Sequence, residues 1–156
     1  MQLDSPVFDL FVQGPRLLRE AVAGMSIEQL RARPVAGRWS TLEVIAHLVD
    51  SEQCYCHRMK RVIAEDRPLL VAYDETRFTE RLGYQTRDPE RELDLFQATR
   101  EQMILVLRGL NPEDWTRLGV HTFEGLLDLA TMVRYEAEHV TNHIVHVVEK
   151  RRALGI

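Results

Sequence analysis

The chain has 156 residues, 45% of them hydrophobic and 28% charged, which is typical of a soluble globular protein with one core. Its net charge of −4 and pI near 5.9 argue against electrostatic capture of nucleic acid. No apolar run could span a bilayer, and the N-terminus has no basic region before an apolar core, so we expect one cytoplasmic domain over residues 1–156 without a membrane partner.

Four long segments show the apolar periodicity of amphipathic helices. The chain shows almost no alternation of apolar and polar residues that would predict a strand. The first runs from about Ser5 to Val22. Pro6 suits its first turn, whereas the pair Gly14–Pro15 predicts a kink or a later start. Residues 25–39 are predicted to form a short helical turn followed by a loop.

The second helix has a clear beginning, because Ser40 and Glu43 form a capping-box pattern, and its apolar series continues to about Glu65. The basic clusters Arg58–Arg61, near its end, and Lys150–Arg152 are each interpreted as a solvated helix face or as a helix C-terminus whose dipole they complement. Residues 67–87 then make a long connection without strong periodicity, which leaves room for a short helical turn.

The third helix begins at Asp88, an N-cap residue followed by proline, and ends at Gly109. Residues 111–115 are predicted to form a further short turn. The last helix begins between Thr122 and Asp128 and runs to about Ala153.

Four helices with one apolar stripe each are most simply buried as an all-α four-helix bundle. Short loops would force neighbouring helices to be antiparallel. The connection of about twenty residues between the second and third helices is long enough for a crossover that leaves these two parallel.

Three histidines lie close together on the last helix, at positions 139, 143 and 146. His139 and His143 are one turn apart beside apolar positions, which makes a good half-site for a metal. His47, between apolar residues of the second helix, is the strongest candidate for a third ligand. The alternative is that these are hydrogen-bonded packing histidines. Three roles remain open for His146: a fourth ligand, a residue that supports a ligand, or an exposed side chain.

Helical geometry places further polar residues near these histidines. Glu43 and Ser51 lie one turn on either side of His47, where either side chain could orient its second ring nitrogen. For Glu43 the capping box is the simpler explanation. Glu138 and Asn142 flank the histidine pair and are expected at the rim of a cavity.

Three neutral imidazoles suit Zn²⁺, Ni²⁺, Fe²⁺ or Cu²⁺, and the sequence alone does not choose among them. Three protein ligands leave a coordination position for water or a substrate, whereas structural zinc sites are usually closed by four. An open position can generate hydroxide, polarise a carbonyl group or hold a thiolate.

This chain resembles the DinB-like superfamily of four-helix metalloproteins in two stretches, GRWSTLEVIAHLVDSE and YEAEHVTNHIVHVV. The pattern of that family has a Trp-Ser entry into the second helix, a histidine followed by leucine, and H-x-x-x-H on the last helix. The matching residues in this chain are Trp39, Ser40, Glu43, His47, Leu48, His139 and His143. Many members carry glutamine where this chain has His146, which leaves the coordination number open.

The resemblance implies an up-down-down-up bundle, often a homodimer, that binds a divalent metal, with zinc or nickel expected first. Characterised branches include low-molecular-weight thiol transferases and thiol-dependent isomerases, so we expect a metal-dependent thiol S-transferase acting on a small molecule. Its catalytic residues are not identified. One alternative is a non-catalytic metal-binding stress-response protein, since the namesakes were noticed through damage induction. The other is a metal-dependent hydrolase with Glu43 or Glu138 as the general base.

Overall fold

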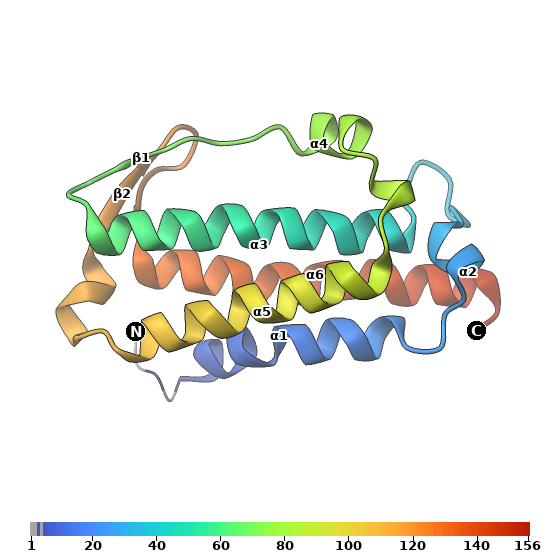
Figure 1. Cartoon of the computed structure of the whole chain (residues 1–156), viewed down its shortest axis with the longest axis horizontal. Helices are drawn as coiled ribbons and strands as arrows, with labels where there is room; N and C mark the ends of the chain where they lie inside the picture. Colours follow the sequence, from blue (N-terminus) through green and yellow to red (C-terminus); the bar gives the residue numbers. More distant parts are fainter. Residues whose placement is uncertain (1–2, 4) are drawn as a thin grey trace.

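Four long helices form the body of the computed structural model, which describes residue 3 and residues 5–156 (Figure 1). They are α1 (Pro6–Val22), α3 (Thr41–Ala64), α5 (Pro89–Arg108) and α6 (Leu129–Leu154). The helices α1 and α6 run in one direction and α3 and α5 in the other, which is an up-down-down-up order (Figure 1). The predicted bundle and the parallel pair are therefore confirmed.

Local capping explains where these helices begin. The side chain of Ser5 accepts a hydrogen bond from Phe8 N, and the side chains of Asp88 and Asp128 cap α5 and α6 in the same way. Ser40 and Glu43 make the predicted capping box at the start of α3. The helix α1 begins at Pro6 and continues through Gly14–Pro15, so its start is not delayed.

The apolar core is divided into two clusters along the bundle. One contains Phe11 and Met59 together with the beginning of α6, and the other contains Leu18, Ile45 and Val147. Between them, buried polar side chains from three helices cross the middle of the bundle: Ser51, Glu52, Arg100 and Glu136. Gly14 of α1 faces this layer, since a Cβ atom there would lie 2.9 Å from Arg100 Nη1.

A small sheet at one end of the bundle differs from the prediction of almost no strands. Its order is β1 (Leu69–Leu70), β2 (Leu118–His121) and β3 (Gly125–Asp128), with β1 parallel and β3 antiparallel to β2. The last helix consequently begins at Leu129, after the β2–β3 hairpin, rather than within 122–128. Strands of two to four residues are too short to show a reliable alternation, which explains the error.

The crossover between α3 and α5 runs back along the outside of α3 (Figure 1). It contains β1, the helix α4 (Glu75–Arg81) and the 3₁₀ turn η1 (Tyr84–Thr86). Its far end is held to α3 because Tyr84 Oη donates to Asp50 at 2.7 Å and Arg87 forms an ion pair with the same carboxylate.

The two remaining elements are the short helix α2 (Ile27–Arg31) and the 3₁₀ turn η2 (Pro112–Thr116), which lie at opposite ends of the bundle (Figure 1). Both were predicted as short turns. Among the described residues, no helix is both long and apolar enough to cross a membrane.

Candidate metal centre

The structure brings together the three histidines that the sequence selected as metal ligands. His47 comes from α3, and His139 and His143 come from successive turns of α6. The Nε2 atoms of His47 and His139 are 3.1 Å apart, and one ring nitrogen from each of the three residues lies within 4.8 Å of the others. The three rings surround a common point, with centroids 4.7 to 5.0 Å apart.

This arrangement fits a divalent metal better than it fits packing histidines. In tetrahedral zinc sites with Zn–N distances of about 2.0–2.1 Å, two ligand nitrogens are about 3.3 Å apart. The 3.1 Å separation of His47 from His139 is close to that value. The Nδ1 atoms of all three residues are buried without a hydrogen-bond partner in the described chain. Since Nε2 is the nitrogen that converges in His47 and His139, these Nδ1 atoms are second ring nitrogens, and the evidence for a metal is the convergence of the three rings.

Burial keeps all three imidazoles neutral at physiological pH. Desolvation, followed by the neighbouring histidines, lowers the pKa of His47 and His139 to about 4 and that of His143 to about 3. Neutral imidazole is the form that binds a metal, so these ligands do not have to release protons before binding near pH 7.

The metal-free protein is expected to lose stability as the pH falls from about 6.5 towards 4. The folded-state pKa values lie below the ordinary value, so in this range the unfolded chain binds more protons, and stability then rises with pH. Urea unfolding with a chelator, at about pH 7.5, 6.0 and 5.0, measures the effect. A His47→Ala/His139→Ala/His143→Ala variant should lose most of this pH dependence. An unchanged dependence in that variant would contradict the assignment.

The polar layer beside the histidines was missed by the sequence analysis. Arg100 donates from Nε to Glu52 at 2.7 Å and from Nη1 to Phe11 O at 2.6 Å, and both charged side chains are fully buried. Glu136 accepts from Ser51 at 3.3 Å and lies 3.9 Å from His139 Nδ1. Burial and the Glu52 charge raise the pKa of Glu136 well above its ordinary value. In the sequence, the signal for this layer was a charged residue among the apolar positions of each helix that contributes to it.

The residues that were predicted to support a ligand or to be a fourth ligand, Glu43, Ser51 and His146, have other partners in the structure. Glu43 accepts from Ser40 N at 2.7 Å and from Arg33 Nε at 3.0 Å, and Ser51 donates to Glu136; neither contacts His47 Nδ1. His146 lies outside the group of converging nitrogens, with its ring 6.1 Å from that of His143 and Nδ1 3.6 Å from Glu149.

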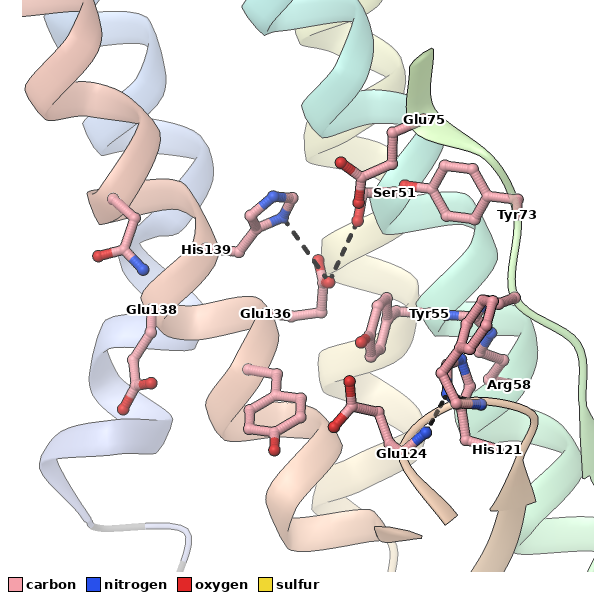
Figure 2. A pocket seen from close by; sticks show the side chains of 14 residues that line it. Ser51, Tyr55, Arg58, Tyr73, Glu75, His121, Glu124, Glu136, Glu138 and His139 are labelled. Carbon is pink, nitrogen blue, oxygen red and sulfur yellow. Dashed lines mark hydrogen bonds and ion pairs between the residues drawn. The ribbon is translucent and has the colours of Figure 1, made fainter. Parts of the chain in front are cut away.

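A cavity of about 400 Å³ opens beside His139, a size that suits a small molecule (Figure 2). We call it the larger cavity. Its walls come from α3, α6, the crossover and the hairpin, and include the predicted rim residues Glu138 and Asn142. Arg58 lines it with only 6% of its surface exposed, so the prediction that it belongs to a solvated face was wrong.

A second cavity, of about 240 Å³, opens beside His143, and we call it the smaller cavity. Trp39 and Val44 form apolar wall, and Arg38 and Lys150 contribute cations. Lys150 lies near the end of α6 and its Nζ donates to His146 O at 3.2 Å, but it is only 2% exposed, so of its two predicted placements the solvated face was wrong. The histidine cluster therefore lies between two cavities.

Sequence comparisons identify a family and named relatives. A family model described as the DinB superfamily matches residues 10–147. A protein of Oceanobacillus iheyensis is 32% identical over 133 residues, which is 85% of this chain and 77% of the relative. YfiT of Bacillus subtilis is 29% identical over 142 residues, 90% of this chain and 80% of the relative. Both relatives bear the provisional name metal-dependent hydrolase.

Two solved structures have the same fold. The structure of YfiT from Bacillus subtilis, a four-helix bundle of unusual topology, matches 96% of this chain and 86% of its own with a TM-score of 0.89 and 27% identity. A mycothiol-dependent maleylpyruvate isomerase matches 91% of this chain and 60% of its own, with a TM-score of 0.71 and 16% identity. At that identity the likeness concerns the fold alone.

Proposed function

This chain belongs to the DinB superfamily, and from that membership and the geometry of its site we propose that it is a metal-dependent transferase that uses a low-molecular-weight thiol. The observation that carries this proposal is the position of the three histidines between two cavities. A transfer between two molecules needs two approaches to one centre, whereas hydrolysis needs only one organic substrate beside water. The related fold of a mycothiol-dependent isomerase is consistent with a thiol.

His47, His139 and His143 would hold the metal, with zinc or nickel expected first among the ions that three imidazoles accept. When bound, a divalent ion supplies a positive charge that lowers the pKa of a nearby thiol. The chain provides three neutral donors and two separated binding volumes beside them. In the transfer, the thiol loses its proton to solvent, sulfur forms a bond to an electrophilic carbon, and the leaving group departs with its bonding electrons.

The walls favour one assignment of the two cavities. The larger cavity carries several charged and hydroxyl groups, which suit a polar thiol. The smaller cavity combines Trp39 and Val44 with the cations Arg38 and Lys150. That combination suits an apolar electrophile and an anionic leaving group.

A metal-dependent hydrolase is the second candidate, and one observation favours it. Glu136 lines the larger cavity 3.9 Å from His139 Nδ1, and its raised pKa is typical of a carboxyl group that acts as a general base near neutral pH. Of the two bases suggested by the sequence, Glu43 is engaged by Arg33, while Glu138 does line the cavity.

The proposed function is tested by loading the protein with Zn²⁺ and supplying 1-chloro-2,4-dinitrobenzene with cysteine, glutathione or coenzyme A. We expect enzyme-dependent formation of the thioether, detected by mass spectrometry, and its loss in His143→Ala. Hydrolysed product alone, formed without any thiol, would support the hydrolase. No product from these or from ester substrates would support the non-catalytic alternative.

A further inference from the structure

Arg58 is a buried cation in the wall of the larger cavity and has no carboxylate partner in the described chain. Its Nη2 donates to Val71 O at 2.7 Å, and the guanidinium carbon lies 4.9 Å from the ring centroid of Tyr55 and 5.9 Å from that of Tyr73. A guanidinium group has five N–H donors, so most of them remain available. A buried charge without a counter-ion is costly, which makes this an uncommon arrangement.

Two other arginines of this protein show the usual arrangement. Arg100, which is fully buried, has the carboxylate of Glu52, and Arg87, with 21% of its side chain exposed, has those of Asp50 and Glu92. Arg58 is buried almost as deeply as Arg100 but faces a cavity. The missing counter-ion is therefore expected to come from a ligand in that cavity.

The surroundings of Arg58 add donors and acceptors to the same end of the cavity. His121 Nδ1 lies within hydrogen-bond distance of the backbone N–H groups of Phe123 and Glu124, at 3.4 and 3.2 Å, so the proton of the neutral ring is on Nε2. The carboxylate of Glu124 also lines this end of the cavity, whereas Glu75 lines the other end, beside Ser51 (Figure 2). Figure 2 shows Arg58 and His121 together, with Glu124 close by and His139 beyond Glu136. The carboxylate of Glu124 would repel a purely anionic ligand, whereas it would attract the ammonium group of a zwitterionic ligand.

The helix α3 connects this end to the metal ligands. Arg58 follows His47 by eleven residues, which brings it back to the same face of the helix about 16 Å further along the axis. A ligand that contacts both ends must therefore be extended, with its reactive group at the histidines and its charged groups at the other end.

We propose that the Arg58 end of the larger cavity binds the amino-acid-like part of an extended thiol, with Arg58 on its carboxylate and Glu124 near its ammonium group. The assignment rests on the proposed transferase function, because it names the class of thiol that this function would use. Arg58 is then a specificity-determining residue that does not touch the reacting atoms.

The test compares glutathione with its diethyl ester, which keeps the thiol and the ammonium group but lacks both carboxylates. Cobalt-loaded protein is titrated with each, and binding is followed by sulfur-to-cobalt absorption. Wild type should bind glutathione at least about 10-fold more tightly than the ester. Arg58→Gln, which retains a donor for Val71 O, should lose this preference without weaker binding of the ester. Arg61→Gln, on the same helix but outside the cavity wall, is the control and should behave as wild type.

Equal binding of acid and ester by wild type would overturn the assignment, as would Arg58→Gln weakening both ligands equally. If neither thiol produces the absorption, the transferase proposal fails, and the subsite is decided by a second measurement. Calorimetric titration of the zinc-loaded protein with S-methylglutathione, whose sulfur is blocked, should then show binding that Arg58→Gln removes. No binding by wild type in that titration would overturn the subsite as well.

Discussion

His47→Ala is expected to leave the purified protein essentially without bound metal, whereas wild type should retain about one equivalent. His47 is the only one of the three converging ligands that α3 provides, and the remaining pair on α6 is a half-site. Because loss of a residue that merely supports a ligand costs about 10–100-fold in affinity, loss of a ligand should cost at least about 100-fold. Elemental mass spectrometry of protein prepared without a histidine tag measures the difference.

His57→Ala is the matched control, because His57 is an exposed histidine ten residues further along the same helix. It should retain metal as wild type does. A full equivalent of metal in His47→Ala would refute the ligand assignment. So would a wild type that remains empty after reconstitution with zinc and with nickel.

Arg100→Met should lower the free energy of unfolding by about 3–5 kcal/mol, because it removes one partner of a buried ion pair. The change leaves Glu52 without its counter-ion, removes the cation nearest Glu136, and takes a hydrogen bond from Phe11 O. Methionine fills much of the volume, so the loss reports the charge more than a cavity.

Urea unfolding in the presence of a chelator separates this effect from metal binding. The control is Arg16→Met, which breaks an exposed pair with Glu20 whose side chains are 58% and 57% exposed, and should change stability by less than about 1 kcal/mol. Adding Glu52→Leu to Arg100→Met should restore part of the loss, since the unpaired charge is then gone. Similar effects of Arg100→Met and Arg16→Met would contradict this account.

The sequence predicted what depends on local chemistry. The second helix was predicted from Ser40 to about Glu65, and α3 spans Thr41–Ala64, because the capping box marks its start. The histidine set was predicted because spacing on an apolar stripe determines which side chains face a bundle interior. In both cases the deciding information is the local pattern within each helix, read for the histidine set on α3 and α6 separately.

The cavity walls and the polar layer depend on contacts between distant segments, and the sequence did not predict them. Arg58 was assigned to solvent because its sequence neighbours are basic, yet the crossover and the hairpin cover it. The pairing of β1 with β2 joins segments about fifty residues apart, and the ion pair of Arg100 with Glu52 joins residues 48 apart. Periodicity within one segment carries no information about such partners.

The crossover has a consequence for how this architecture can diversify. It supplies Ala72, Tyr73 and Glu75 to the larger cavity, while all three histidines belong to α3 and α6. Its ends are fastened independently, at β1 and at Asp50, so insertions and substitutions between them alter the cavity without disturbing the helices. Evolution or protein engineering can therefore exchange the reactants of this scaffold by changing one surface segment while the inherited ligand set stays the same.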